Sequence, residues 1–223
     1  MASADQEPSS LFKWHQRIYD EAFKRLGMRW ELVVYPALRI GAQLDQGLID
    51  GEVIRTRAYA QAHPDLIRVE ESLFDTVFAL YSTNPALELK NLGDLPALKL
   101  RVYYRRGVIY CERALKSVLP ADQIYDVTDV EQGLKMLLAG RMDVFCDMDF
   151  QVRDLLASMD FKDSTRVRKV LVLGTEPLYP YLAHKNAELA PRLAATIKAM
   201  KAEGLIECYR VEAFSTASKP CTR

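Results

Sequence analysis

The sequence predicts an α/β protein of two lobes, each a mostly parallel sheet with flanking helices. The first observation is a repeated phrase, Leu-x-x-Gly-x-x-Asp, at residues 44–50 and again at residues 137–143. In both copies the glycine follows the last apolar position of a helical segment, where it can adopt the left-handed conformation that ends a helix. Short apolar segments follow, residues 51–54 and 144–146, which are typical of buried parallel strands. We therefore expect one such helix-to-strand joint in each lobe.

The second observation is the order of segments around the first phrase. Residues 11–26 carry apolar side chains at the spacing of an amphipathic helix, which a glycine ends. Residues 31–35 form an apolar strand that a proline stops. Residues 38–46 then predict a second helix, and residues 51–55 a second strand. Because helices alternate with strands here, we expect a parallel sheet.

The rest of the chain continues with short apolar runs and amphipathic segments. We expect further strands over residues 66–69, 74–82, 99–104, 123–127, 144–146, 167–173 and 178–184. We expect further helices over residues 108–118, 130–138, 149–159, 190–203 and 205–214. The middle of the chain is therefore a self-contained α/β unit inserted into another one. We expect a discontinuous first lobe (residues 1–82 and 181–223), an inserted second lobe (residues 83–180) and two crossover strands that act as hinges.

Composition excludes several classes of protein. Lys and Arg together number 30, and Asp and Glu together also number 30. The chain therefore lacks the excess of basic residues that would indicate nucleic-acid binding. No run approaches the roughly 18 apolar residues of a membrane span. The four cysteines form no C-x-x-C pair, and the three histidines are scattered, so we expect no metal and no other cofactor. Cys208 and Cys221 have a spacing that suits a disulfide in an oxidising compartment, while four free thiols are the equal alternative.

The first ten residues are polar and acidic, and they contain no signal peptide. Met1 is followed by Ala-Ser-Ala, which matches the small-x-small end of a cleaved secretory signal. We therefore expect a periplasmic or extracellular protein whose signal peptide has been removed and to which a start methionine has been added. The alternative is a cytoplasmic protein with a disordered tip.

Four phrases, in order, carry a resemblance to a known family, and the likeness covers nearly all of residues 17–214. They are residues 47–51 (GLIDG), residues 91–95 (NLGDL) before 100–107 (LRVYYRRG), residues 138–143 (LAGRMD), and residues 189–193 (LAPRL) leading to 204–206 (GLI). The chain resembles the type II periplasmic solute-binding proteins, specifically the family that serves polar amino-acid ABC transporters. This resemblance implies a two-lobed clamshell that acts as a monomer. It also implies a small-molecule ligand and an ABC transporter permease as a candidate partner.

The sequence departs from the family's pattern at three places. Only about ten polar residues precede Leu11, so the strand that opens the family's fold is expected to be absent or irregular. The family's carboxylate-binding arginine falls at Ala62 in an ungapped count, and its amine-binding aspartate falls at Met148. The resemblance therefore implies ligand binding more firmly than an amino-acid ligand.

Candidate ligand-binding residues follow the predicted parallel strands, because open α/β sheets bind ligands at the carboxyl ends of their strands. Arg55 and Arg57 follow the strand over residues 51–54, and an arginine there can hold a carboxylate through two hydrogen bonds. We prefer Arg55, which is nearer the strand end. Arg39, at the start of a helix, is a third candidate. A solvated loop position is the alternative for each arginine.

A second set of candidates lies at the turn after the strand over residues 99–104. The turn consists of Arg106, Gly107 and Val108, and a helix begins there, so free backbone N–H groups and the positive helix end suit an anion. Tyr104 and Tyr110 are candidates for flat walls of a binding site, although we expect at least one of them to pack in the core.

The leading interpretation is an extracytoplasmic protein that captures a small polar, carboxylate-bearing ligand, an amino acid or a related compound, between its lobes. Asp147 and Asp149 are candidates for a cation on that ligand, with Asp147 favoured. We expect no catalytic residues, since the sequence shows no nucleophile elbow and no phosphate loop. One alternative is an enzyme on the same scaffold, similar to cyclohexadienyl dehydratase, with Asp147, Asp149 or Glu52 as a general acid. The other is a ligand-sensing module that acts in trans on a partner protein.

Overall fold

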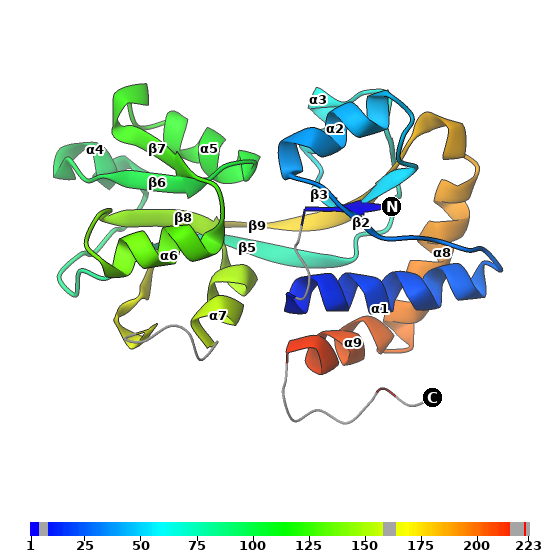
Figure 1. Cartoon of the computed structure of the whole chain (residues 1–223). Helices are drawn as coiled ribbons and strands as arrows, with labels where there is room; N and C mark the ends of the chain where they lie inside the picture. The colour runs from blue at the N-terminus through cyan, green and yellow to red at the C-terminus, as the bar shows by residue number, and fades with distance from the viewer. Residues whose placement is uncertain (5–8, 158–163, 215–220, 222–223) are drawn as a thin grey trace. The chain divides into compact units, whose positions relative to one another are not determined.

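The computed structural model describes residues 1–4, 9–157, 164–214 and 221. The chain divides into two compact units, which we describe one at a time. Unit 1 consists of Met1–Asp75 and Pro177–Arg223, and unit 2 consists of Thr76–Glu176. Both changes of unit fall inside strands, β5 (Phe74–Ser82) and β9 (Arg168–Leu182), so each of these strands begins in one unit and ends in the other (Figure 1).

The sheet of unit 1 is parallel at one side and antiparallel at the other. Its strands are β1 (Ala2–Ser3), β2 (Val33–Val34), β3 (Gly51–Thr56), β4 (Ile67–Arg68) and the last part of β9. Strand β1 lies between β2 and β3 and is parallel to both. Strand β9 is antiparallel to β3 and to β4. The carboxyl ends of β1, β2 and β3 therefore lie at one edge of this sheet.

The first strand is present, and the expectation that it was absent or irregular was wrong. Ala2 and Ser3 are completely buried between β2 and β3. The ladder is continued by hydrogen bonds from the Val33 amide to the Met1 carbonyl and from the Tyr35 amide to the Ser3 carbonyl, both 3.1 Å. Two small residues are enough to fill this central position, but they are too few to show the alternation that marks a strand in sequence.

Helices cover both sides of the sheet in unit 1. They are α1 (Ser10–Arg25), α2 (Ala37–Asp45), α3 (Tyr59–Ala62), α8 (Leu189–Ala202) and α9 (Leu205–Phe214), with a short 3₁₀ turn η4 (His184–Asn186). Figure 1 shows α2 and α3 on one side of the sheet and α1 and α9 on the other. The Trp14 ring nitrogen donates to the Ile206 carbonyl at 2.9 Å, which joins α1 to α9. The Tyr19 hydroxyl donates to the Val53 carbonyl at 2.6 Å and joins α1 to β3.

The sheet of unit 2 is mostly parallel, as the sequence predicted. Its order is β5, β8 (Val144–Met148), β6 (Val102–Arg105) and β7 (Ile124–Val127). Strand β6 is parallel to both β7 and β8, whereas β8 is antiparallel to β5. The register pairs Tyr104 with Cys146 and therefore continues toward Arg105 and Asp147 at the carboxyl ends of β6 and β8.

Unit 2 has a hydrophobic core on each side of its sheet. Its helices are α4 (Leu95–Leu98), α5 (Ile109–Lys116), α6 (Val130–Leu138) and α7 (Asp149–Ala157), with 3₁₀ turns η1 (Leu92–Asp94), η2 (Ala121–Gln123) and η3 (Ser164–Arg166). Leu80 of β5 packs with α4 and α5, while its neighbour Tyr81 packs with α6 and α7. This alternation shows that both faces are buried.

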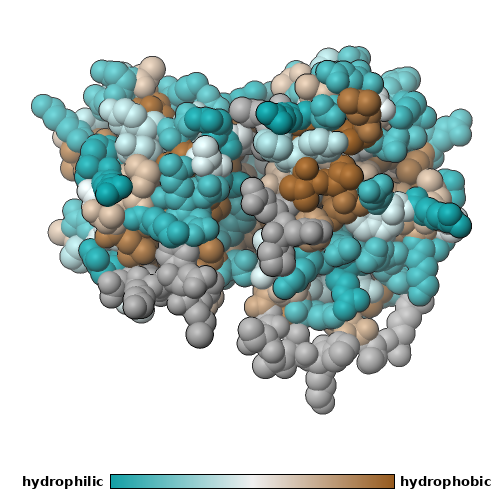
Figure 2. All heavy atoms as spheres, in the orientation of Figure 1, coloured by the Kyte–Doolittle hydropathy of each residue, from teal (hydrophilic) through white to brown (hydrophobic). Residues whose placement is uncertain are grey.

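On the face shown in Figure 2, hydrophilic residues cover most of the surface and hydrophobic ones form small patches.

The two copies of the repeated phrase form the same joint, so this prediction is confirmed. Gly47 and Gly140 have φ angles of 69° and 68°, in the left-handed region. The residue after each glycine donates to the carbonyl five positions earlier, from Leu48 to Gln43 at 3.0 Å and from Arg141 to Met136 at 2.9 Å. These bonds form the glycine-terminated motif that ends helices.

Two disulfides close loops within the units. The bond between Cys208 and Cys221, which the sequence left open, is present in unit 1. A second bond joins Cys111 of α5 to Cys146 of β8, and both cysteines are completely buried. The sequence did not predict this second pair, because its members are 35 residues apart and occupy apolar positions of a helix and a strand. It fastens α5 onto the sheet of unit 2.

Candidate functional site

The end of β3 in unit 1 holds a buried ion pair. Arg55 Nε lies 2.6 Å from Glu52 Oε1, and the Glu52 side chain is only 1% exposed. The Arg55 guanidinium also stacks 4.9 Å above the centre of the Tyr59 ring. Burial and the nearby Glu52 carboxylate raise the pKa of Tyr59 above its ordinary value of 10. The charge of Arg55 is thus already compensated inside unit 1.

A bulge explains how Glu52 meets Arg55. Residues three apart on a regular strand point to opposite faces of the sheet. Here Glu52 pairs with Tyr181 and Arg55 with Tyr179, so β3 uses one residue more than β9 over the same stretch. The extra residue brings the two side chains to the same face, as bulges re-aim side chains at strand ends.

Arg57, two residues further along, is exposed. Its guanidinium donates one hydrogen bond of 3.1 Å to the Tyr179 hydroxyl and lies 5.8 Å from the centre of that ring. Arg68 stacks on the same ring at 5.0 Å and is itself bonded to Glu70. Among the described residues, no carboxylate pairs with Arg57. Arg39 is also exposed near the start of α2, and its side chain has no ion-pair partner in the described part of the chain.

The end of β8 in unit 2 carries the candidate Asp147, which is already held by an arginine. The carboxylate is completely buried and accepts two hydrogen bonds from Arg105, at 2.8 and 3.0 Å. It also accepts a bond of 2.6 Å from the Met148 amide. Arg105 was not among the residues predicted for the site. The signal that points to it is the parallel register of β6 and β8, which sets their last residues side by side.

Asp149 opens helix α7 and is bound by three side chains. It lies 3.0 Å from Arg153 and 2.5 Å from Lys169, and it accepts a hydrogen bond from the Tyr81 hydroxyl. Burial acts to raise the pKa of the Asp149 carboxyl, but the bonds from Lys169 and Tyr81 outweigh it, so the pKa is lowered. Burial and Asp149 together raise the pKa of Tyr81.

In the turn after β6, an ion pair and a backbone hydrogen bond already engage two of the polar groups predicted to bind an anion. Arg106 pairs with Asp126 at 2.6 Å on the surface. Gly107 has a φ of 87°, a conformation that favours glycine, and the Val108 amide donates to the Arg105 carbonyl at 3.0 Å. Val108 itself is buried.

The two candidate tyrosines near this turn pack against apolar neighbours. Tyr104 is 8% exposed and belongs to the core of unit 2, and burial raises its pKa. Tyr110 stacks on Phe78 with ring centres 4.3 Å apart, and its hydroxyl donates to the Leu173 carbonyl at 3.3 Å. A Cβ at Gly174 would lie 2.2 Å from the Tyr110 hydroxyl, so this packing requires a glycine on β9.

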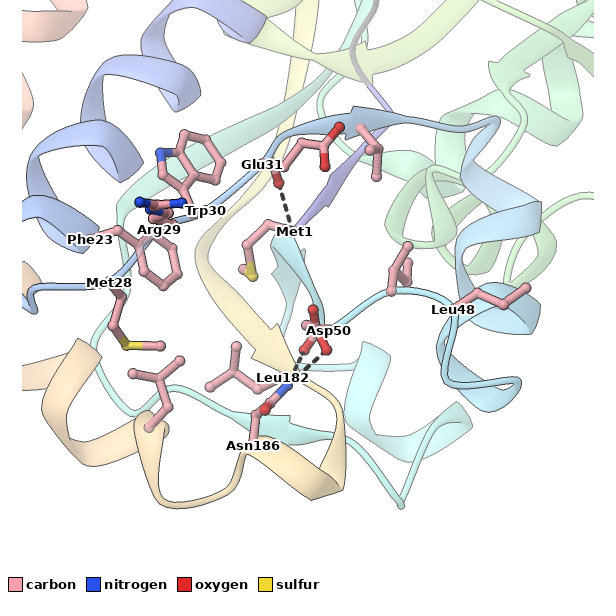
Figure 3. Close-up of a pocket in the computed structure, with 13 residues that line it drawn as sticks. Met1, Phe23, Met28, Arg29, Trp30, Glu31, Leu48, Asp50, Leu182 and Asn186 are labelled. Atoms are coloured by element: carbon pink, nitrogen blue, oxygen red, sulfur yellow. Dashed lines mark hydrogen bonds between the residues drawn. The ribbon is translucent and has the colours of Figure 1, made fainter.

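A pocket of about 510 Å³ lies elsewhere in unit 1, at the amino ends of β1, β2 and β3 (Figure 3). Its walls combine apolar side chains with charged and polar ones. The close-up shows the terminal amine of Met1 donating to the Glu31 carbonyl and the Asn186 amide donating to the Asp50 carboxylate. Asp50 also pairs with Lys185 at 2.8 Å, and the hydrogen bond from Lys185 lowers the pKa of the Asp50 carboxyl. Because α/β sheets bind ligands at the opposite, carboxyl ends of their strands, the charged ends of β3 and β8 remain the better candidates.

Within the described ranges, no three His, Cys, Asp or Glu side chains gather as metal ligands would. None of the described helices combines the length and the apolar character that crossing a membrane requires.

Comparison with known proteins identifies the fold but leaves the sequence family open. No family model matches the chain. An uncharacterized protein of Shewanella oneidensis is 29% identical over 209 residues, which cover 94% of this chain and 79% of that protein.

Many solved structures share the fold at low sequence identity. A mutant of the arginine-binding protein ArgBP from T. maritima has a TM-score of 0.75 at 15% identity, with 96% of this chain and 93% of that chain covered. The amino-acid ABC transporter substrate-binding protein AbpA from Streptococcus pneumoniae, bound to L-arginine, has a TM-score of 0.74 at 14% identity and 90% and 83% coverage.

A third neighbour is an ancestral amino-acid-binding protein, AncCDT-1, described as a precursor of cyclohexadienyl dehydratase. Its TM-score is 0.72 at 18% identity, with 96% of this chain and 93% of that chain covered. The chain therefore has the two-lobed fold of the periplasmic amino-acid-binding proteins of ABC transporters, as the resemblance in sequence implied.

Proposed function

We propose that this protein is an extracytoplasmic solute-binding protein that captures a small polar, carboxylate-bearing ligand for an ABC transporter. The observation that carries the proposal lies at the carboxyl end of β3, where Arg57 is exposed and no described carboxylate pairs with it. A guanidinium at this position can hold a carboxylate through two parallel hydrogen bonds. The structural neighbours, which include amino-acid-binding proteins of ABC transporters, support the same function.

The charges at the strand ends favour an acidic group on the ligand. Asp147 and Asp149, which we predicted for a ligand cation, are both bound to basic side chains of unit 2. The half-buried side chain between them is Met148, whose thioether is only a weak acceptor. We therefore propose an amino acid or a related acid, with the carboxylate as the group that the protein recognises.

Ligand binding in this proposal is coupled to hinge bending. Strands β5 and β9 are the two segments through which the chain passes from one unit to the other. Domain closure around a ligand uses a few residues at such crossings.

The two disulfides support an extracytoplasmic location. Disulfides persist in oxidising compartments such as the bacterial periplasm and are rare in the reducing cytosol. The buried position of Cys111 and Cys146 suits a bond that is formed once during folding and then kept.

A thermal-shift screen of amino acids, organic acids and polyamines tests the proposed function. A ligand at a hundredfold excess over its Kd stabilises the folded state by about 2.7 kcal/mol, which is a measurable shift. We expect a shift with at least one carboxylate compound. If no compound in the three classes produced a shift, the solute-binding proposal would be contradicted.

The runner-up is a dehydratase-like enzyme, which the AncCDT-1 neighbour favours. Its candidate general acids are Glu52, Asp147 and Asp149, and all three are paired with basic side chains. The lowered pKa of Asp149 keeps that carboxyl ionised at neutral pH, which opposes a role as a proton donor. An assay for turnover of prephenate and arogenate decides between the two functions, and we expect none.

A further inference from the structure

We infer that the two arginines at the end of β3 have different roles: Arg57 binds the carboxylate of the ligand, whereas Arg55 belongs to a buried support that fixes the strand end. This inference rests on the proposed function and reverses the preference for Arg55 that position in the sequence suggests. The support consists of Glu52, Arg55 and Tyr59, and we call it the Glu52 cluster.

The Glu52 cluster is enclosed within unit 1. Glu52 is 1% exposed and the Arg55 side chain 17% exposed, and their charged atoms lie 2.6 Å apart. The Tyr59 ring, 5% exposed, stacks under the guanidinium of Arg55. A ligand carboxylate that took Arg55 would have to compete with a buried carboxylate already in contact. Separating a buried pair leaves an uncompensated charge, which is strongly unfavourable.

Arg57 has the opposite properties. It is exposed, and in the described part of the chain it faces a phenol rather than a carboxylate. An arginine has five N–H donors, and one of those of Arg57 donates a hydrogen bond to the Tyr179 hydroxyl. The guanidinium carbon of Arg57 also lies over the Tyr179 ring, 5.8 Å from its centre, and a fork held in this way before binding loses less entropy when it binds a carboxylate.

The bulge in β3 connects these two roles. One extra residue turns Arg55 to the face of Glu52; beyond it Thr56 still pairs with Leu178, and Arg57 is the first residue after the strand. Tyr179, on the neighbouring strand β9, pairs with Arg55 in the ladder and with Arg57 through its hydroxyl. The cluster thus sets the position from which Arg57 and Tyr179 meet a ligand.

The test follows the Nε–Hε signals of the arginines by NMR during titration with acetate, succinate and L-glutamate. The variants Arg55→Lys and Arg57→Lys assign the two signals. We expect the Arg57 signal to move saturably with at least one of these three carboxylates and the Arg55 signal to stay in place. A saturable shift of Arg55, or no saturable shift of Arg57 with any of the three, would overturn the assignment.

Urea unfolding separates support from recognition without any ligand. We expect Arg55→Ala to lower the unfolding midpoint and Arg57→Ala to leave it unchanged. The double variant Glu52→Gln/Arg55→Met removes both charges and should regain most of the lost midpoint. Arg29→Ala, which removes an exposed arginine at the amino ends of the same sheet, is the matched control. Equal destabilisation by Arg55→Ala and Arg57→Ala would count against the division of roles.

The outcomes distinguish this inference from the proposed function. If the thermal-shift screen finds a carboxylate ligand, Arg57→Ala should weaken its binding at least tenfold. If Arg55→Ala instead abolished binding at an unchanged unfolding midpoint, while Arg57→Ala bound normally, the inference would fail and the solute-binding function would stand. If the Arg57 signal responded to acetate while the screen found no ligand, the solute-binding function would fail, and only the division of roles between Arg55 and Arg57 would stand.

Discussion

The charged strand ends of the two units contain the same kinds of residue, but their charges face different partners. In unit 2, Asp126, Asp147 and Asp149 are each paired with a basic side chain. In unit 1, Glu52 pairs with Arg55, while Arg57 carries a charge that no described carboxylate compensates. The comparison shows that position at a strand end does not make a charged residue a ligand contact. Burial and the nearest partner determine whether it supports the fold or recognises a ligand.

The largest expected effect concerns the buried pair of unit 2. Replacing Arg105 with alanine leaves the completely buried Asp147 carboxylate without its partner. We expect a loss of about 3–5 kcal/mol in the free energy of unfolding, the usual cost of an uncompensated buried charge. Urea denaturation measures it.

The double variant Arg105→Ala/Asp147→Asn is the control for charge, and it should recover a large part of the loss. If Arg105→Ala cost less than about 1 kcal/mol, as the loss of a surface pair does, the Arg105–Asp147 pair would not act as a buried support of unit 2.

The disulfides offer a second comparison of the units. In the chain-entropy model, a loop of 35 residues stabilises by about 4 kcal/mol and a loop of 13 residues by about 3 kcal/mol. We therefore expect Cys111→Ala/Cys146→Ala to lower the free energy of unfolding more than Cys208→Ala/Cys221→Ala. The difference between the two losses in the free energy of unfolding should be larger still, because the first pair is buried and removing its sulfurs also leaves a cavity. Calorimetry of both double variants tests the order, and the reverse order would contradict it.

A smaller effect is expected from pH. The pKa of the Asp149 carboxyl is lower in the folded chain than its ordinary value of 3.8. The unfolded chain therefore takes up protons first as pH falls. The stability that Asp149 contributes is present above pH 3.8 and is lost as pH falls below it through the folded value.

Unfolding measured between pH 6 and pH 3 should show a weaker acid dependence in Asp149→Asn than in the parent. Asp65→Asn, which removes an exposed carboxylate of unit 1, serves as the control and should keep the parent's dependence. Identical acid dependence in the parent and Asp149→Asn would show that the contacts from Lys169 and Tyr81 do not stabilise this carboxylate.

The smallest effect concerns the exposed pair at the turn of unit 2. The side chains of Arg106 and Asp126 are 52% and 34% exposed, so their pairing is screened by solvent. We expect Arg106→Ala to change the free energy of unfolding by less than about 1 kcal/mol. Urea denaturation of Arg106→Ala and Arg105→Ala under the same conditions compares the two adjacent arginines. A loss above about 2 kcal/mol in the free energy of unfolding for Arg106→Ala would mean that Arg106 also supports the fold of unit 2.

Much of the fold could be predicted because its signals are local. The helix ends at Gly47 and Gly140 follow from a backbone conformation that glycine adopts without strain, and the parallel strands after them follow from short apolar runs. Strand β1 was missed because two residues show no periodicity. Strand β9 was expected as two separate strands, over residues 167–173 and 178–184, and it forms one.

The candidate site was predicted less well, for a physical reason. Sequence reasoning identified the strand ends that carry charge, since topology places such ends at one edge of a sheet. It did not identify Arg105 as the partner of Asp147, or Glu52 as the partner of Arg55. Both pairs depend on register, the first between β6 and β8 and the second on the bulge in β3.

The fold class, the repeated helix-to-strand joint and the residues available for recognition all follow from the sequence alone. These depend on local backbone preference and on apolar periodicity, which neighbouring residues express in any context. Which charges are compensated depends on the tertiary structure, because Arg105 and Asp147, like Cys111 and Cys146, are far apart in the chain, and Glu52 shares a face with Arg55 only through the bulge against β9. For that reason Arg57 can be told apart from Arg55 in the folded chain, although the two lie two residues apart in the sequence.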